Sequence, residues 1–168
     1  TDPFMNGYPE VTEMSIKAIR KLNASGIKCV TLTKGILPFE LAQLSKANEY
    51  GITLISLDEA YRERMEPGAA SYHDRLVALR ALHDAGCHTW VSIEPYPTPN
   101  LIEQDLLDIL NAVDFVDKII FGRTNYCKEV TAYTQHKQFY NQQATRVTAF
   151  CQEHGIQYHI KEKTITEG

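Results

Sequence analysis

The chain has 168 residues, of which 43% are hydrophobic and 23% are charged, so it can form one domain with a buried core and lacks the composition of a disordered segment. Its net charge of −4 gives no general attraction to phosphate backbones, which argues against nucleic-acid binding through bulk charge. No apolar run reaches the roughly eighteen residues of a membrane span and no signal peptide is recognisable, so we expect a cytoplasmic protein.

Apolar periodicity and glycine positions predict alternating strands and helices along the chain. In order, the predicted elements are a strand end at 1–4, a helix from Pro9 to Gly26, a strand at 28–33, a helix ending at Gly51, a strand at 52–57, a helix from Ser71 to Gly86, a strand at 88–94, a helix capped by Asn100 and Glu103, a strand at 118–121, a loop at 122–131, a long helix ending at Gly155 and a strand at 156–160.

A glycine between helix and strand recurs at Gly26, Gly51, Gly86 and Gly155, as is typical of helices that end in a left-handed residue. This repeat predicts an α/β fold with a parallel sheet and right-handed crossovers, in a single domain over residues 1–168. Six strands are fewer than the eight of a closed barrel.

The stretch from Ile52 to Arg75 is the middle repeat of this series. Its strand carries Ser56 at the C-terminal end, where parallel α/β sheets bind ligands. Ser71, with Asp74 three residues later, predicts a capped helix, on which Arg75 is expected to anchor the preceding loop. The acidic residues between strand and helix are interpreted as a solvated loop face rather than a metal site; they are Asp58, Glu59, Glu63 and Glu66.

Side-chain alternation on the strand 88–94 predicts which residues share a face. Val91 and Ile93 are expected to meet helices. The opposite face then carries Trp90, Ser92 and Glu94. A serine and a carboxylate together near a strand end indicate a wet or ligand-filled cavity, with a structural ion pair as the alternative for Glu94.

Two further strand ends carry polar candidates. Lys34 ends the strand 28–33, where it is either a ligand contact or an ordinary solvated lysine. Asn125 follows the strand 118–121 on the edge expected to bind ligands.

The four cysteines are widely separated and form no Cys-x-x-Cys pair; they are Cys29, Cys87, Cys127 and Cys151. Neither a zinc site nor a disulfide pattern is indicated, and we expect reduced thiols. The histidines also lack metal-ligand spacing, so we predict no metal site from this chain's own residues.

Five motifs follow one another over residues 1–95: TDPF at 1–4, LTKG at 32–35, ISLDE at 55–59, MEPGAASYHDRLVALRALHDAG at 65–86 and WVSIEP at 90–95. In this order they resemble the radical S-adenosylmethionine (radical SAM) superfamily, in the branch similar to spore photoproduct lyase. The resemblance implies a partial (β/α)6 TIM-like barrel with parallel strands whose first βα unit is missing from this chain. Because the chain opens at Thr1, we expect it to be an excerpt of a longer protein.

The resemblance also implies a cofactor. Members bind S-adenosylmethionine across the C-terminal strand ends, beside a [4Fe-4S] cluster held by a Cys-x-x-x-Cys-x-x-Cys loop, and generate a 5′-deoxyadenosyl radical that abstracts hydrogen from the substrate. This chain has no such cysteine triplet, so the cluster is expected in the full-length protein and not on this chain's cysteines.

By position, Thr1 and Asp2 match the segment near the methionine amine. Lys34 and Ser56 match contacts to the carboxylate and ribose, and Glu94 matches a cavity position. The predicted cofactor-binding residues, from the resemblance and from strand position together, are Thr1, Asp2, Lys34, Ser56, Ser92, Glu94 and Asn125. No catalytic residue and no substrate is assigned.

Two other functions stay open on the sequence. One is a non-catalytic barrel-like module for binding or assembly, and the other is an ordinary α/β barrel enzyme that uses Lys34 and Glu94 as general acid and base. We also expect the isolated chain to self-associate, because a missing first strand leaves an unpaired sheet edge and uncovered apolar surface.

Overall fold

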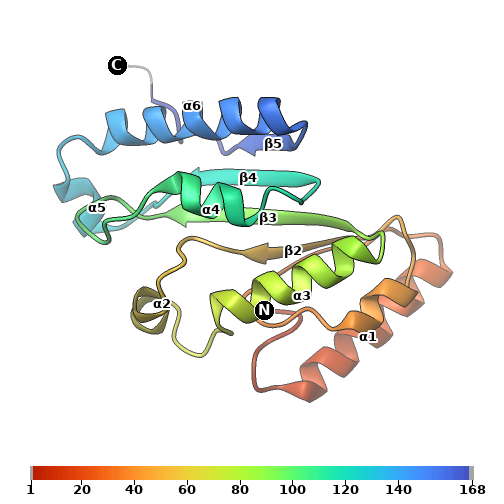
Figure 1. Ribbon diagram of the computed structural model, residues 1–168. Helices are drawn as coiled ribbons and strands as arrows, with labels where there is room; N and C mark the ends of the chain where they lie inside the picture. The colour runs from red at the N-terminus through yellow and green to blue at the C-terminus, as the bar shows by residue number, and fades with distance from the viewer. Residues whose placement is uncertain (1, 167–168) are drawn as a thin grey trace.

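Five strands form one parallel sheet in the order β1-β2-β3-β4-β5 in the computed structural model, which describes residues 2–166 (Figure 1). The strands are β1 (Val30–Thr33), β2 (Glu49–Thr53), β3 (His88–Tyr96), β4 (Lys118–Arg123) and β5 (Gln157–Ile160). The helices are α1 (Pro9–Ala24), the 3-10 helix η1 (Phe39–Gln43), α2 (Glu59–Met65), α3 (Tyr72–Asp84), α4 (Leu106–Ala112), α5 (Lys128–Ala132) and α6 (His136–His154). Each strand pairs with the next strand along the chain, as in part of a barrel, and the predicted α/β class is confirmed.

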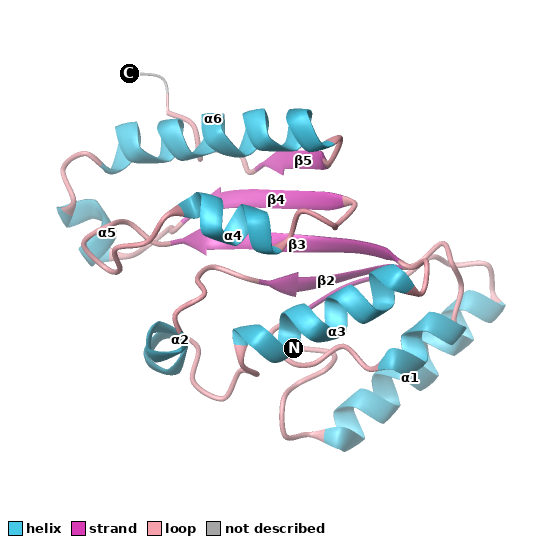
Figure 2. Cartoon of the chain, in the orientation of Figure 1, coloured by secondary structure: helices cyan, strands magenta, loops and turns pink. Residues whose placement is uncertain are grey.

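All carboxyl ends of the strands lie at one edge of the sheet, because every strand pair is parallel. In Figure 1 the arrows of β2 to β5 point the same way, toward the side on which α2 and α5 lie. Figure 2 shows long loops joining helices and strands at this carboxyl edge. None of the helices in residues 2–166 is long and apolar enough to span a bilayer.

The two faces of the sheet differ in what covers them. On the helix face, Ile52, Val91 and Phe121 are completely buried in the hydrophobic core. Helix α3 contacts β2 and β3, and α6 contacts β4 and β5. On the opposite face, which we call the open face, Val30 and Leu32 of β1 are 55% and 39% exposed.

The predicted parity of β3 is confirmed. Val91 and Ile93 belong to the core, whereas Trp90 and Ser92 alternate with them and lie on the open face.

Two strand glycines make room for large side chains of β3 on the open face. A Cβ at Gly51 of β2 would lie 2.3 Å from Cε2 of Trp90, and one at Gly122 of β4 would lie 2.7 Å from Cδ of Glu94. Close approach of a neighbouring side chain therefore requires glycine at both positions.

The local signals of the three longest helices are confirmed. Helix α1 has Pro9 in its first turn, and the hydroxyl of Ser71 accepts a hydrogen bond from the backbone N–H of Asp74 at 3.0 Å to cap α3. Gly155, with φ 69°, ends α6 in the left-handed conformation.

Two predictions in the first third of the chain are wrong. Residues 2–4 form a turn rather than a strand end, so the described sheet has five strands and not six. The helix expected before Gly51 is reduced to η1, and β2 starts at Glu49, which places Gly51 inside a strand. The side chain of Asn48 explains the early start, because it accepts a hydrogen bond from the N–H of Cys29 at 2.9 Å and so ties the segment before β2 to β1.

The acidic stretch after β2 is not a loop, and of its four predicted solvated carboxylates only Asp58 and Glu63 are exposed. It forms α2, in which Asp58 caps the helix by accepting from the N–H of Tyr61 at 2.8 Å. Glu59 accepts from the N–H of Tyr72 at 2.6 Å, and Glu66 is 4% exposed.

Two later predictions also differ from the structure: the start of α4 and the loop 122–131. Asn100 does not cap α4, because its side-chain amide donates to the carbonyl of Glu129 at 2.9 Å. Asp105 caps α4 instead by accepting from the N–H of Leu107 at 3.1 Å. The predicted loop 122–131 contains the start of the short helix α5.

Candidate functional site

An open depression of about 510 Å³ lies at the carboxyl end of β1. Its lining comes from the opening segment, the end of β1 and the turn after α2, and includes Asp2, Tyr8, Lys34, Met65 and Glu66. Two of the predicted cofactor-binding residues, Asp2 and Lys34, are thereby brought together.

Asp2 ties the opening segment to the end of β1. Its Oδ1 accepts hydrogen bonds from the N–H of Phe4 at 2.9 Å and from the hydroxyl of Thr33 at 2.5 Å. Its Oδ2 accepts from the N–H of Lys34 at 2.7 Å. Because each carboxylate oxygen accepts about two hydrogen bonds, Oδ2 keeps capacity for one more donor.

Gly35 permits this docking of the opening segment. A Cβ at Gly35 would lie 1.7 Å from the carbonyl oxygen of Phe4, so no other residue fits without moving the backbone. The TDPF and LTKG motifs are therefore two halves of one contact.

Lys34 is not an ordinary solvated lysine. Its side chain is 43% exposed, and its Nζ lies 2.8 Å from Oε1 of Glu66, a carboxylate that is itself buried. The contact is an ion pair by distance, and the ammonium group keeps donors for a ligand or water.

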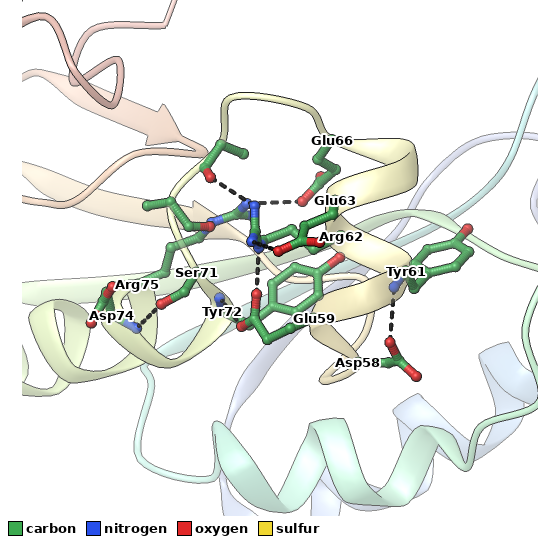
Figure 3. Close-up of polar contacts among 12 residues, drawn as sticks. Asp58, Glu59, Tyr61, Arg62, Glu63, Glu66, Ser71, Tyr72, Asp74 and Arg75 are labelled. Carbon is green, nitrogen blue, oxygen red and sulfur yellow. Dashed lines mark hydrogen bonds and ion pairs between the residues drawn. The ribbon is translucent and has the colours of Figure 1, made fainter.

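Arg75 holds the other oxygen of Glu66. The two side chains face each other in Figure 3, with Nη2 of Arg75 2.9 Å from Oε2 of Glu66 and both side chains fully or almost fully buried. Arg75 also donates to the carbonyls of Ala70 and Thr53, each at 2.9 Å, which confirms that it anchors the loop. Lys34, Glu66 and Arg75 together carry one net positive charge.

Two tyrosines beside this cluster stay protonated. Burial raises the pKa of Tyr61 to about 12 and also raises the pKa of Tyr72, whose ring centroid lies 4.9 Å from the guanidinium of Arg75. Their phenol groups are therefore neutral near pH 7 and unsuited to act as bases.

Ser56 does not lie beside Lys34. It stands three residues past the end of β2, is 0% exposed, and its hydroxyl accepts from the N–H of Asp58 at 3.1 Å. It lines a separate depression of about 290 Å³ together with Gln104 of the segment before α4. Ser56 and Lys34 therefore line different depressions.

Ser92 and Glu94 lie farther along the same edge, on the open face. Ser92 is 5% exposed and stands opposite Thr53 in the β2–β3 register. The Oε2 of Glu94 lies 3.4 Å from Nζ of Lys161, which follows β5. The ion pair considered as the alternative for Glu94 is thus present, and it passes over Gly122. Lys34 and Glu94 each pair with a different partner, which gives no support to a joint acid–base role.

The remaining predicted residues lie at the edge of the site or beyond it. Asn125 is exposed after β4, and its Oδ1 accepts from Nε of Arg123 at 2.9 Å. Thr1 lies outside the described residues.

The four cysteines lie on different segments of the fold and are all free. Cys29 and Cys87 precede β1 and β3 at the amino edge of the sheet, Cys127 follows β4, and Cys151 is inside α6. Burial raises the pKa of Cys151 to about 11, so this thiol stays protonated. Within residues 2–166 no group of three or more His, Cys, Asp or Glu side chains could hold a metal ion, so these residues do not fit a [4Fe-4S] cluster.

Sequence reasoning missed Glu66 as a site residue. Its acidic neighbours suggested a solvated surface, and a nearby signal was available in the Pro67-Gly68 turn, which reverses the chain toward Arg75. A carboxylate and an arginine on either side of such a turn can pair, although the third partner, Lys34, comes from a distant strand.

Known proteins resemble the chain in sequence pattern and in fold. A family model described as "Radical SAM superfamily" matches residues 2–113. The crystal structure of Streptococcus suis SuiB bound to precursor peptide SuiA is similar with a TM-score of 0.58 and 16% identity, over 89% of this chain and 34% of that chain. At this identity the likeness concerns the fold alone, and the chain spans only that third of SuiB. No curated protein matches the chain.

Proposed function

The chain belongs to the radical SAM superfamily, and from this premise we propose that it binds S-adenosylmethionine in the depression beside β1. The α-amino-acid end of this cofactor carries a carboxylate and an ammonium group. Lys34 and Asp2 line the same depression. The ammonium of Lys34 can bind the cofactor's carboxylate, and the carboxylate of Asp2 can bind its ammonium group. This pairing of charges is the observation that carries the proposal.

The rest of the depression suits the cofactor's less polar parts. Its volume of about 510 Å³ lies within the roughly 300–1,000 Å³ of small-molecule sites. Tyr8 and Met65, 50% and 45% exposed, supply aromatic and thioether surface for the adenosine end. In this proposal Ser92 and Glu94 face the substrate side, Asn125 borders the site, and Ser56 holds its loop.

The radical chemistry is a property of the family. When bound beside a [4Fe-4S] cluster, S-adenosylmethionine supplies a 5′-deoxyadenosyl radical for hydrogen abstraction. Residues 2–166 offer no ligand set for that cluster, so we assign to them the binding and orientation of the cofactor and not its cleavage.

We further propose that the chain belongs to the spore photoproduct lyase-like branch and acts as one domain over residues 1–168. The MEPG motif supports the branch, since it supplies the carboxylate that pairs with Lys34. SuiB is bound to a precursor peptide in its crystal, but its likeness to this chain is one of fold, and we leave the substrate unassigned.

Anaerobic calorimetric titration with S-adenosylmethionine tests the proposal. A charge-assisted hydrogen bond contributes about 1.5 to 3 kcal/mol, so Lys34→Ala should weaken binding roughly tenfold to a hundredfold. Lys34→Arg should restore only part of the affinity, because a planar guanidinium cannot replace a point charge. Lys17→Ala is the matched control, as Lys17 is a 71% exposed lysine in an ion pair on α1.

Absence of binding by the unchanged protein would contradict the proposal and favour a non-catalytic module. Equal affinity of the Lys34→Ala and unchanged proteins would remove Lys34 from the site.

A further inference from the structure

One short segment, Glu66 to Ala70, contacts Lys34 at two points. The carboxylate of Glu66 pairs with the side-chain ammonium at 2.8 Å, and the N–H of Ala70 donates to the main-chain carbonyl of Lys34 at 2.9 Å. The main chain and the ammonium group of Lys34 are thus both contacted by the same turn, which comes from the α2–α3 connection rather than from β1.

The segment itself is held from both neighbouring helices. Arg62 of α2 donates to the carbonyl of Ala69 at 3.0 Å, and Arg75 of α3 donates to that of Ala70 at 2.9 Å. Figure 3 shows both arginines converging on this turn. The turn is therefore a rigid support and not a free loop end.

A carboxylate beside Lys34, such as that of Glu66, should repel the carboxylate of a ligand. Arg75 removes this repulsion by pairing with Glu66. The guanidinium lies 2.9 Å from Glu66, and the two side chains are 0% and 1% exposed, so Arg75 cancels the charge of Glu66 within the protein interior. What remains toward the depression is the positive charge of Lys34.

We infer that Glu66 is the positioning residue of Lys34, and that Arg75 lets Glu66 orient the ammonium without repelling an anionic ligand group. Orientation matters because a free lysine loses rotamer freedom when a ligand fixes it, whereas here the ion pair with Glu66 restricts the side chain beforehand. The inference rests on the proposed cofactor site. It extends that site to two residues that need not touch the ligand.

A double-mutant cycle between residues 34 and 66 tests the inference by titration with S-adenosylmethionine. Glu66→Gln keeps the shape of the side chain and removes its charge, and it should weaken binding. If Glu66 acts through Lys34, Lys34→Ala should then cost at most about threefold in the Glu66→Gln protein, against roughly tenfold or more in the unchanged protein. Equal factors in the two backgrounds would overturn the inference.

Glu63→Gln is the control, since Glu63 is a 73% exposed carboxylate on α2, the helix just before Glu66, and should leave affinity unchanged. Glu66→Asp should recover part of the coupling if it folds, because it restores the charge. A thermal melt of each variant separates a loss of folding from a loss of orientation.

A second readout needs no ligand. In protein with ¹³C-methylated lysines, the Lys34 resonance, assigned by its loss in Lys34→Arg, should be shifted and broadened relative to exposed lysines, and should join them in Glu66→Gln. A Lys34 signal already at the position of exposed lysines would overturn the inference. If the unchanged protein does not bind S-adenosylmethionine but this signal behaves as expected, the proposed function fails while the positioning of Lys34 stands.

Discussion

Single residues in this protein take their roles from buried partners. Lys34 stands at a strand end with nothing in its local sequence to distinguish it from a solvated lysine, yet it pairs with a buried carboxylate. Arg75 is the clearest case, because a fully buried guanidinium is tolerated only where its charge and its donors are matched.

Replacing Arg75 with Met should destabilise the protein strongly. The change leaves Glu66 buried without its guanidinium partner, and such a broken pair costs about 3 to 5 kcal/mol. Chemical denaturation measures the loss. Arg20→Ala, at an exposed arginine of α1, should change the free energy of unfolding little; an equally small change for Arg75→Met would mean that water reaches Glu66.

Glu49 predicts a pH dependence. Hydrogen bonds from Lys118 and then from Lys28 hold the pKa of Glu49 below its ordinary value of 4.5. A carboxyl with a lowered folded-state pKa contributes stability above its unfolded pKa, and this contribution is lost as the pH falls through the folded-state pKa. Glu49→Gln should therefore be less stable than the unchanged protein near pH 7, and the difference should shrink below pH 4.5 and vanish in stronger acid.

Glu13→Gln is the comparison for this titration. Glu13 pairs with Lys17 on the exposed surface of α1, where ion pairs contribute little, so its removal should not alter stability measurably at any pH. A pH-independent loss in Glu49→Gln would assign the effect to shape rather than charge.

Neighbouring strands of the sheet pack against each other through large side chains of β3 that lie over glycines of β2 and β4. Trp90 of β3 lies over Gly51 of β2, and Glu94 of β3 lies over Gly122 of β4. Both contacts lie on the open face. The strands therefore depend on these contacts as well as on their backbone hydrogen bonds.

Gly51→Ala should destabilise the protein by about 1 to 3 kcal/mol, the usual cost of overpacking. The added methyl group meets the indole ring and not the backbone, so the same substitution made in a Trp90→Ala protein should cost much less. Thermal melts followed by circular dichroism compare the four proteins. Equal costs in both backgrounds would place the strain in the backbone of β2.

The whole molecule presents a one-sided sheet. Its helix face is buried, its open face exposes apolar residues of β1, and both β1 and β5 are edge strands with unpaired backbone groups. Such surfaces favour association between copies or with another segment of protein.

Sedimentation velocity should show concentration-dependent self-association of the 168-residue chain. Leu32→Lys, which places a charge on the open face, should reduce it. Met14→Lys changes a 67% exposed methionine on α1 and should not. A compact monomer at high concentration would contradict the prediction.

Features that depend on neighbouring residues along the chain could be predicted from the sequence. Helices α1, α3 and α6 each have one terminal signal in the local sequence, namely Pro9, Ser71 and Gly155. The alternation of β3 already separates its core side chains from Trp90 and Ser92. The parallel α/β class follows from the succession of such units.

Features that depend on a partner residue in another element could be recognised only in the folded protein. Gly51 reads like a helix-ending glycine, but the indole of Trp90 from β3 explains it. Glu66 reads like part of an acidic surface, but Lys34 and Arg75 arrive from β1 and α3 to bury and neutralise it. The physical reason is that backbone propensity and capping act over a few residues, whereas burial and ion pairing act through space. Lys34 and Glu66 are 32 positions apart in the sequence, and Gly51 and Trp90 are 39 positions apart.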